Sequence, residues 1–420
     1  MPTVLDLHIH SKYSRACSQK LTLPNIDKTC RQKGVGVIST GDFTHPEWFA
    51  HIKENLEEIN NSGLFKLKGS DGKVRFILGT EISTIYKKGD KTRRIHTCFF
   101  APSLEVVEKV NNWLDDNGYN IKSDGRPILG MDIIDLAKLF WKFDERCLVI
   151  PAHIWTPWYA MFGSKSGFDS IEEAWGDVAD KIKAIETGLS SDPPMNWRLS
   201  ALDNITLVSN SDAHSLKNIA REANVFAHNI EDLTYDEIKR VIEEKDKDKF
   251  LYTIEFYPEE GRYHYDGHRK CKVSFPPKLS KENNLLCPVC KKKLVLGVSY
   301  RVDDLADREL GFKPKSAIPY KHLIELDKII ADSVGIKSRK SKKVMSYYNN
   351  ILRYAKNELD VLLNEKIENI AKWSTPLIAE GVKRVRNGEV KVIPGYDGEY
   401  GKIEIFTAKE VKGGKQKTLL

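Results

Sequence analysis

The sequence predicts an α/β fold, a parallel sheet closed into a barrel, followed by two smaller parts. Over residues 1–250, seven apolar, β-prone segments alternate with stretches of helical character, which is typical of a parallel sheet covered by helices. Reactive side chains follow directly after the expected strands, where barrels and open α/β sheets place their active sites. From residue 256 the chain becomes aromatic, basic and cysteine-bearing, and from residue 319 it becomes helical.

The individual elements follow from local composition. Short runs of Val, Ile, Leu and Phe predict strands at 4–8, 35–39, 75–78, 96–100, 147–150, 182–185 and 205–208. Apolar residues spaced three or four positions apart predict helices at 48–59, 104–115, 132–142 and 171–179. The same spacing recurs over residues 319–386, so we expect the last part of the chain to be mainly helical.

Length and composition limit the class of protein. At 420 residues the chain exceeds a single core, and 41% of its residues are hydrophobic. No uninterrupted apolar run is long enough to span a bilayer, so no membrane partner is expected. The N-terminus has no signal-peptide pattern and the cysteines number seven, an odd count, so we expect a reducing cytoplasm rather than a disulfide framework.

The net charge of +7 is unevenly distributed. Residues 1–250 carry 33 Lys and Arg against 37 Asp and Glu, whereas residues 251–420 carry 33 against 22. An acidic first part joined to a basic second part is typical of a catalytic body with a module for a polyanion. A solvated lysine-rich surface would give the same balance.

Two histidines at the end of the first expected strand, His8 and His10, are the most informative feature. Residues two apart in a strand point the same way, so the two imidazoles project together. Further metal-ligand types follow later strands, namely Asp42, Glu81, His153, Asp212 and His214. Mixed imidazole and carboxylate sets hold divalent ions in hydrolytic sites, and clustered ions bind phosphate oxygens and activate water. The pattern therefore predicts a phosphoester hydrolase.

These motifs have a recognisable order. His8-Ile9-His10, Gly41-Asp42, Glu81, His153 and Ser211-Asp212-Ala213-His214 resemble the PHP (polymerase and histidinol phosphatase) superfamily over about residues 1–235. The resemblance implies a distorted, roughly seven-stranded β/α barrel that holds two or three divalent ions (Zn, Mn or Mg). It places one ion on His8, His10, Glu81 and Asp212, a second on Glu81, His96 and His153, and a third on Asp42 and His214.

By the same match, the catalytic residues are Asp212, His214, His153 and Glu81. The segment around the third ion departs from the superfamily pattern. Many relatives have Asp-His where Gly41-Asp42 stands, and a further ligand where this chain has Ser14, Arg15 and Ala16. Glu186, after the strand at 182–185, is expected either beside the metals or as an ordinary loop acid.

A cysteine cluster follows the catalytic part. His268 and Cys271 precede Cys287 and Cys290 in an HxxC…CxxC pattern, and two such ligand pairs can wrap a tetrahedral zinc ion. Structural zinc would supply folding energy that so small a module cannot obtain from a core. Free or redox-active cysteines are the alternative reading.

Two further groups point to the substrate. Five basic residues fall between 337 and 343, among them Lys340 and Lys343, and such density binds phosphate backbones, although a solvated basic loop would look the same. Aromatic residues crowd the segment after His153, and Trp155, Trp158 and Tyr159 are candidates to stack on an extruded base. Individually, such aromatics are more often part of a core.

The whole chain, including Thr40-Gly41-Asp42-Phe43-Thr44-His45-Pro46 and Pro394-Gly395-Tyr396-Asp397-Gly398, resembles the endonuclease Q family of archaeal and sporadically bacterial DNA-repair enzymes. The resemblance implies cleavage of the phosphodiester 5′ to deaminated bases (hypoxanthine, uracil, xanthine) or abasic sites, leaving 3′-hydroxyl and 5′-phosphate. It implies DNA as the partner and a nucleoid-associated place in the cytoplasm.

We therefore expect four parts: a PHP catalytic domain (1–250), a zinc-binding module (251–315), a basic helical DNA-binding domain (316–405) and a flexible basic tail (406–420). The terminal Gln416-Lys417-Thr418-Leu419-Leu420 resembles an incomplete sliding-clamp (PCNA) box that lacks its aromatic pair. Alternative functions are a PHP phosphatase for small phosphate esters, a 3′–5′ exonuclease, and a DNA-binding scaffold without activity.

Overall fold

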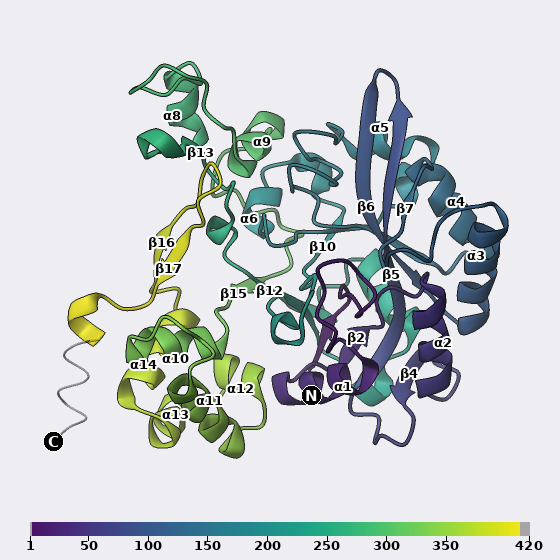
Figure 1. Cartoon of the computed structure of the whole chain (residues 1–420), viewed down its shortest axis with the longest axis horizontal. Coiled ribbons are helices and arrows are strands. Elements are labelled where there is room, and N and C mark those ends of the chain that lie inside the picture. The colour runs from purple at the N-terminus through teal and green to yellow at the C-terminus, as the bar shows by residue number, and fades with distance from the viewer. Residues whose placement is uncertain (1, 412–420) are drawn as a thin grey trace.

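The computed structural model describes residues 2–411. Figure 1 shows a large body of strands and helices, a small module around α8 and α9, and a group of short helices, α10 to α14. The body mixes α-helices with a central sheet, so the prediction of an α/β fold is confirmed. None of the described helices is long and apolar enough to cross a membrane.

All seven predicted strands are present. They are β1 (Thr3–Asp6), β2 (Val37–Ser39), β5 (Arg75–Lys88), β6 (Lys91–Ala101), β8 (Leu148–Pro151), β9 (Ala184–Glu186) and β10 (Thr206–Val208). The main sheet adds β3 (Leu56–Glu58), β4 (Leu64–Leu67), β7 (Ile128–Leu129), β11 (Ala223–Phe226), β12 (Phe250–Glu255) and β15 (Tyr320–His322). Its order is β15-β12-β11-β1-β2-β5-β4-β3, with β6 paired to β5 and β8, and β7 paired to β5.

The prediction of a purely parallel sheet is wrong. The pairs β1–β2, β2–β5 and β9–β10 are parallel, but β5–β6, β6–β8 and β1–β11 are antiparallel. Only Gly89 and Asp90 separate β5 from β6, and Gly89 has a φ of 60°. Two residues make a tight hairpin turn and leave no room for the crossover helix that a parallel pair requires.

Helices cover the body on the outside. They are α1 (Leu23–Lys33), α2 (Pro46–Asn55), α3 (Leu104–Asp116), α4 (Ile133–Phe143), α5 (Ile171–Trp175), α6 (Pro193–Asn196) and α7 (Tyr235–Glu243). The predicted helix 48–59 ends early because Leu56–Glu58 pairs with β4 as a strand. The predicted helix 171–179 stops at Trp175, where Gly176 turns to a φ of 53° and a 3-10 segment follows.

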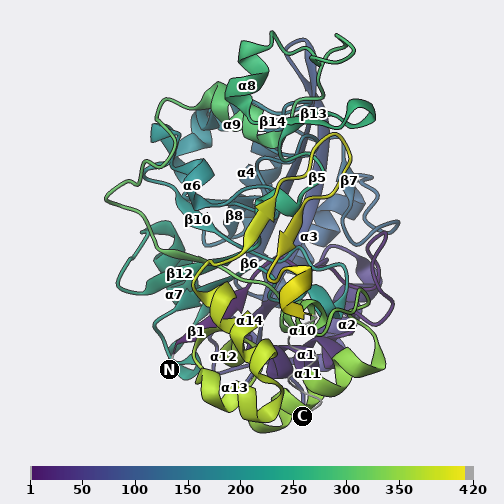
Figure 2. The same cartoon turned by 90° about the vertical axis from the view of Figure 1, so that its left-hand side faces the viewer.

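The second half of the chain forms the small module and the helical group. The module contains β13 (Asp266–His268), β14 (Val273–Phe275), α8 (Pro277–Glu282) and α9 (Val298–Leu305). The helical group contains α10 (Leu326–Val334), α11 (Lys342–Tyr354), α12 (Glu358–Leu363), α13 (Ile367–Trp373) and α14 (Pro376–Arg386). A hairpin of β16 (Lys391–Ile393) and β17 (Lys402–Glu404) runs from the helical group to the module, as both views show (Figures 1 and 2).

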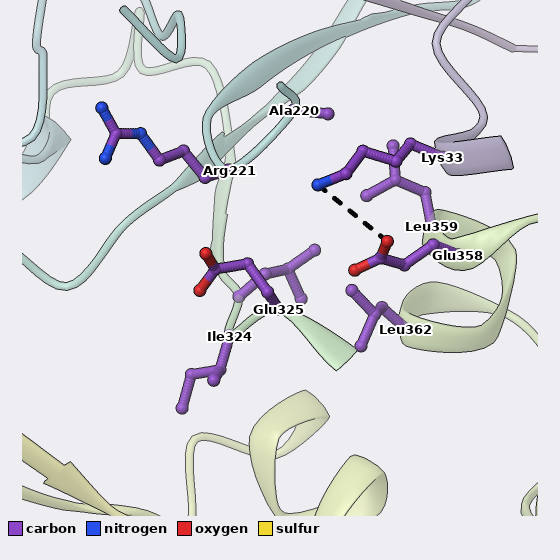
Figure 3. Close-up of a pocket in the computed structure, with 9 residues that line it drawn as sticks. Lys33, Ala220, Arg221, Ile324, Glu325, Glu358, Leu359 and Leu362 are labelled. Atoms are coloured by element: carbon purple, nitrogen blue, oxygen red, sulfur yellow. Dashed lines mark ion pairs between the residues drawn. The ribbon is translucent and has the colours of Figure 1, made fainter. Parts of the chain in front are cut away.

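A buried ion pair joins the body to the helical group (Figure 3). Lys33 Nζ, at the end of α1, lies 3.9 Å from Glu358 Oε2, at the start of α12. The same ammonium donates to the carbonyl oxygens of Lys217 and Ile219 over 2.7 and 2.8 Å. The helical group is therefore connected directly to the loop that follows β10.

The division into four parts stays a prediction. The main sheet draws on both sides of the expected boundary at residue 315, because β15 pairs in parallel with β12. Residues 412–420, including the expected clamp box at 416–420, lie outside the described residues. Of the expected tail, residues 406–411 are described, and Glu410 Oε1 accepts a hydrogen bond from Arg384 over 2.7 Å.

Candidate metal centre

Backbone pairing beyond the end of β1 positions the first two histidines. The chain continues extended through Ile9, which forms a parallel bridge with Ala213. The His10 N–H donates to the Ala213 carbonyl over 3.1 Å, so the segment stays in register after the regular strand has ended. The segment carrying His8 and His10 therefore lies against the segment carrying Asp212, although the two are about 200 residues apart in sequence.

Four side chains converge in a first ligand group. His8, His10, Glu81 and Asp212 each offer one ligand atom, and these atoms all lie within 4.8 Å of one another. His10 Nε2 lies 3.2 Å from Glu81 Oε2 and 3.1 Å from Asp212 Oδ1. His8 Nε2 lies 3.5 Å from Glu81 Oε2. Two imidazoles and two carboxylates at these separations fit one divalent ion.

A second ligand group shares Glu81. Its other carboxylate oxygen, Oε1, lies 2.8 Å from His96 Nδ1 and 3.0 Å from His153 Nε2. The two imidazole nitrogens are 3.3 Å apart. Glu81 therefore belongs to both ligand groups, through a different oxygen in each.

Unpaired buried atoms test whether the first group fits a metal. His8 Nε2, His10 Nε2 and Asp212 Oδ1 are all buried and have no hydrogen-bond partner within residues 2–411. Buried polar atoms almost always form hydrogen bonds, and these three lie at ion-pair distance from one another or from Glu81 without doing so, as ligand atoms around a shared cation do. Each is an atom that binds metal, and a divalent cation satisfies all three.

The ligand side chains differ in protonation. Burial opposes the charge on Glu81, but its neighbours His96, Arg126 and His8 bring the pKa of Glu81 well below its usual range. Burial lowers the pKa of His96 to about 4, which favours the neutral imidazole, whereas, against the effect of burial, neighbouring acidic groups raise the pKa of His8, His10 and His153 above its usual value. Metal binds a neutral imidazole, so an ion would displace protons from these three histidines.

Glu186 supports both ligand groups from behind. Its carboxylate lies 3.0 Å from His8 Nδ1, and it accepts hydrogen bonds from Asn210 Nδ2 over 3.1 Å and from the His153 N–H over 3.3 Å. A carboxylate on the far nitrogen of a metal-binding imidazole fixes its orientation and raises its basicity. Of the two expectations for Glu186, the position beside the ligands is therefore the one observed.

Asp42 and His214, expected at a third ion, both lie next to His10, and their assignment to a third ion stays a prediction. Asp42 Oδ1 lies 2.9 Å from His10 Nδ1, and its Oδ2 accepts hydrogen bonds from the Ser11 N–H and the Ser14 hydroxyl. Both oxygens are thus engaged in orienting His10 and its loop. Ser14, one of the three residues expected where the superfamily pattern has a further ligand, supports Asp42 in this way.

His214 lies at the rim of the first group. Its ring packs edge-on against His10, with centroids 4.6 Å apart, and its Nδ1 lies 2.9 Å from the Asp212 carbonyl oxygen. The side chain is partly exposed, unlike His8 and His10. This position suits contact with a substrate better than ligation of a buried ion.

Sequence analysis missed Arg126. Its guanidinium Nη1 donates to Glu81 Oε2 over 3.0 Å, so a cation lies beside both ligand groups. Gly125, immediately before it, lies so close to Asp42 that any side chain there would collide with the carboxylate. The Gly-Arg dipeptide in a loop was the available signal, but on its own it is too common to identify a site.

Three site residues have left-handed backbone, with φ of 50° at Asp42, 31° at His153 and 44° at Asp212. Each lies within a few residues of the end of a strand. Residues other than glycine rarely adopt this conformation, and such strain concentrates at functional sites. The turns direct these side chains toward the centre of the cluster.

The cysteine module also forms a ligand group. His268, Cys271, Cys287 and Cys290 offer ligand atoms within 4.8 Å of one another. Although burial opposes ionisation, hydrogen bonds from the backbone amides of Cys290 and Val289 hold the pKa of Cys287 at about 6. A thiol that ionises near neutral pH is a good zinc ligand.

The predicted substrate-binding residues have different environments. Trp155 is buried in the core and donates its indole N–H to Asn196 Oδ1 over 2.8 Å, so it does not face a substrate. Trp158 is exposed, and Tyr159 packs against His96 with ring centroids 4.7 Å apart. Lys340 and Lys343 are exposed just before and within the first turn of α11.

Comparison with known proteins adds to this geometry. A family model described as the MJ0043 C-terminal domain matches residues 325–389. The uncharacterized protein MJ0043 of Methanocaldococcus jannaschii is 32% identical over 271 residues, which are 63% of this chain and 33% of that protein. The chain thus spans about a third of the length of this relative.

Two solved structures match nearly the whole chain. One is the lesion-specific endonuclease PfuEndoQ from Pyrococcus furiosus, with a TM-score of 0.84 and 31% identity over 98% of this chain and 99% of that chain. The other is an endonuclease Q complex with a 27-mer duplex substrate that has an abasic lesion at the active site. It matches with a TM-score of 0.83 and 32% identity over 98% of both chains.

The fold and the ligand groups, taken with these matches, define the chain as an enzyme of the metal-dependent endonuclease class. The chain belongs to the endonuclease Q family. Two predictions are thereby confirmed, the family resemblance and enzymatic activity. The metal-ligand roles of the individual residues stay predictions, now supported by the distances above.

Proposed function

We propose that this chain is a DNA-repair endonuclease that hydrolyses the phosphodiester 5′ to deaminated bases or abasic sites and leaves 3′-hydroxyl and 5′-phosphate ends. The observation that carries the proposal is the pair of ligand groups sharing Glu81, which suits an in-line displacement at phosphorus. The similarity to endonuclease Q, whose structure holds a duplex with an abasic lesion, supports DNA as the substrate.

The architecture of the body supports a distorted PHP-type barrel. β9 and β10 pair with each other in parallel and not with the main sheet, so the ring of strands is interrupted by this separate pair. Loop contacts join the pair to its neighbours, as where the Ile154 N–H donates to the Glu186 carbonyl over 3.1 Å.

His8, His10, Glu81 and Asp212 would hold one divalent ion, and Glu81, His96 and His153 a second, each Zn, Mn or Mg. Such ions lower the pKa of a water and neutralise charge on the phosphate. The protein positions these ligands: Asp42 orients His10 and Glu186 orients His8.

Two further side chains face the reacting phosphate. Arg126 lies beside Glu81 with fixed donors that match phosphate oxygens, so it would bind a non-bridging oxygen of the scissile group. His214 has its Nδ1 against the Asp212 carbonyl, which leaves Nε2 to contact the leaving 3′-oxygen at the rim. Neither role requires a third metal.

The cysteine group would hold one structural zinc ion on His268, Cys271, Cys287 and Cys290. The exposed Lys340 and Lys343 of the helical group would contact DNA phosphates, and binding should weaken with salt as counterions are released. Association with the nucleoid and weak clamp binding through 416–420 remain expectations from the sequence.

Cleavage of lesion-bearing duplexes tests the proposal. End-labelled duplexes with deoxyinosine, uracil, an abasic site or no lesion are incubated with the full chain and Mg²⁺ or Mn²⁺, and cut positions are read on a denaturing gel. We expect one internal cut 5′ to each lesion, none in the Asp212→Asn variant, and unchanged cleavage in Asp236→Asn, an exposed carboxylate on α7.

Other outcomes identify the alternatives. A ladder of products from the 3′ end would indicate an exonuclease. Hydrolysis of a phosphomonoester without any cut in DNA would indicate a phosphatase. If Asp212→Asn cut lesion DNA as fast as the native chain, the metal centre proposed here would be refuted.

A further inference from the structure

A line of aromatic residues leads from the metal centre to the surface. It begins at His96, whose backbone N–H donates to the Tyr159 carbonyl over 3.0 Å and whose ring packs on Tyr159. Trp158, the residue before Tyr159 in the chain, is 47% exposed. Thr156 Oγ1 donates to the Trp158 carbonyl over 2.9 Å and lies 3.2 Å from His153 Nδ1. The same hydroxyl group therefore contacts both Trp158 and His153, a residue of the second ligand group.

The line crosses from the body to the second half of the chain. The Trp158 ring meets the Tyr263 ring edge-on, with centroids 6.5 Å apart. Arg262 places its guanidinium 5.9 Å from the Tyr263 ring and 5.2 Å from the ring of Tyr400. Tyr400 is 70% exposed. We call Trp158, Tyr263, Arg262 and Tyr400 the aromatic ridge.

Backbone hydrogen bonds fix the loop that carries Tyr400 against the segment that carries Arg262 and Tyr263. The loop between β16 and β17 is held against residues 259–269 by hydrogen bonds from Gly395 N to Glu259 O (2.8 Å), Tyr265 N to Gly395 O (2.9 Å) and Gly398 N to Arg262 O (3.0 Å). A side chain at Gly395 or Gly401 would collide with carbonyl oxygens of that segment, so the close approach requires glycine. The residues of the ridge are therefore held in place before any ligand binds.

The charge of the ridge selects the kind of ligand. Within residues 2–411 the contacts of the Arg262 guanidinium are with the rings of Tyr263 and Tyr400 and not with a carboxylate, so its charge can meet an anion. Exposed aromatic rings interleaved with an unpaired guanidinium are the combination that binds single-stranded nucleic acid, because rings stack on bases and the cation meets phosphates. A membrane or an apolar peptide would leave this arginine without a partner.

We propose that the aromatic ridge binds unstacked bases of the DNA strand beside the scissile phosphodiester. This inference rests on the function proposed above and names the part of the substrate that the surface recognises. The loop tip around Tyr400, which has no part in the metal centre, is thereby assigned a role in holding DNA next to it. Since every base has a flat face, the ridge should show little preference for sequence.

Fluorescence of 2-aminopurine tests the proposal. A duplex carries this base next to an abasic site and is bound by the full chain with the Asp212→Asn change, which prevents cleavage. Tyr400→Ala and Trp158→Ala should weaken binding roughly 5- to 100-fold each, the loss of one stacked base, and should abolish the change in fluorescence on binding. Trp158→Phe should restore most of the binding.

Phe312→Ala is the matched control, because Phe312 is 42% exposed and lies 4.2 Å from the Arg308 guanidinium outside the ridge. It should bind as the native chain does. Tyr400, being mostly exposed, can be replaced without loss of folding, and melting curves verify this. If Tyr400→Ala and Trp158→Ala both bind and alter the fluorescence like the native chain, the ridge is not a base-binding surface.

The outcome is separable from that of the proposed function. Lesion cleavage that depends on Asp212 but is indifferent to Tyr400 and Trp158 would overturn the ridge alone. Absence of lesion cleavage in the native chain would overturn the proposed function, whatever the ridge variants do.

Discussion

Asp42 Oδ1 lies 2.9 Å from His10 Nδ1, and both side chains are buried. An ionised carboxylate only accepts hydrogen bonds, so Nδ1 carries a proton, and this contact turns Nε2 toward Glu81 and Asp212. Burial acts to raise the pKa of Asp42, but His10 and Ser11 lower it below its usual value, so the carboxylate is ionised. Against the effect of burial, Asp42 and Asp212 raise the pKa of His10 well above its usual value, so a metal ion on Nε2 would displace a proton. Asp42 is therefore a positioning residue for His10.

We expect Asp42→Asn to lower metal affinity about 10- to 100-fold while leaving the fold intact. The asparagine preserves the shape but removes the charge that fixes the histidine tautomer. Titration of activity with Mn²⁺, and metal content after dialysis against a weak chelator, measure the change. Asp27→Asn, another buried carboxylate on α1 but away from the centre, should show native metal content. Equal metal affinity in the Asp42 and Asp27 variants would contradict this role.

Arg126 gives a second prediction. Arg126 Nη1 is 3.0 Å from Glu81 Oε2, and the guanidinium would stabilise charge that develops on the phosphate. Arg126→Met should lower kcat about 100- to 1000-fold, with a smaller change in KM, because the contact strengthens in the transition state. Steady-state cleavage of an abasic duplex separates the two constants.

Arg146→Lys serves as the control, since Arg146 is exposed and pairs with Asp144 at a distance from the metal centre. If Arg126→Met raised only KM, the arginine would contribute to binding alone. If it changed neither constant, its contact with Glu81 would be structural.

The strand ends made most of the centre predictable. Most ligand residues follow or lie within strands that are recognisable from their apolar composition, so the order of the elements predicts that these residues converge. They are His8, His10, Glu81, His153 and Asp212. Arg126 lies in a loop with no periodic pattern, and its place depends on how closely Gly125 approaches Asp42. That contact joins segments about 80 residues apart, and no local signal encodes it.

The aromatic residues show the same limit. Trp155 and Trp158 belong to one cluster in the sequence, yet one is buried with its indole N–H bonded to Asn196 and the other is exposed. The left-handed turns at His153 and Tyr159 decide which ring faces the core, and composition does not reveal them. Likewise, only the two-residue link between β5 and β6 distinguishes a hairpin from a crossover.

The cysteine module gives a prediction on metal removal. Its buried hydrophobic cluster is small, containing Val273, Cys287 and Leu294, so metal ligation must supply much of its stability. Cys287→Ser should abolish zinc binding at the module and lower the melting temperature of the protein. The metals of the catalytic centre should be retained. Zinc content and a thermal melt measure both effects.

Cys17→Ser is the control, because Cys17 lies outside the module and has no part in its ligand group. It should keep native zinc content. A Cys287→Ser chain that kept its zinc and its melting temperature would show that the four residues do not form a structural site.

The ion pair between Lys33 and Glu358 leads to a fourth prediction. Both are buried, and Glu358 also accepts a hydrogen bond from Tyr348 Oη over 2.6 Å. Removing one partner leaves the other charge buried with neutral hydrogen-bond partners alone, which costs up to about 3–5 kcal/mol. Lys33→Met and Glu358→Gln should each lower the free energy of unfolding measured with urea, because each weakens the contact between the body and the helical group. The double variant should lose less stability than the sum of the two single losses.

The same pair should affect catalysis, because Lys33 Nζ also holds the carbonyls of Lys217 and Ile219 in the loop after Asp212. Lys33→Met should therefore lower the rate of lesion-DNA cleavage more than Glu358→Gln does. Lys53→Met provides the comparison, since Lys53 pairs with Glu108 at the surface. Additive effects of the two buried changes would show that the residues act independently.

Glu255 gives a prediction on pH. It is fully buried on β12, where Thr253 and Thr187 donate to its oxygens over 2.5 and 3.1 Å. Burial above all, together with the charge of Asp192, raises the pKa of Glu255 from 4.5 to about 8. The folded chain therefore holds a proton that the unfolded chain releases above pH 4.5. Between pH 4.5 and 8 the free energy of unfolding should fall as pH rises, by up to about 1.4 kcal/mol per unit.

Glu255→Gln should remove this part of the pH dependence, because the amide mimics the protonated acid. Urea unfolding at pH 5, 7 and 9 should therefore show a flatter profile for the variant, with its largest gain in stability over the native chain at pH 9. Glu244→Gln, on the exposed face at the end of α7, should keep the native slope. A Glu255→Gln chain that lost stability with rising pH as steeply as the native chain would show that Glu255 is ionised in the fold, with the threonine hydroxyls compensating for its burial.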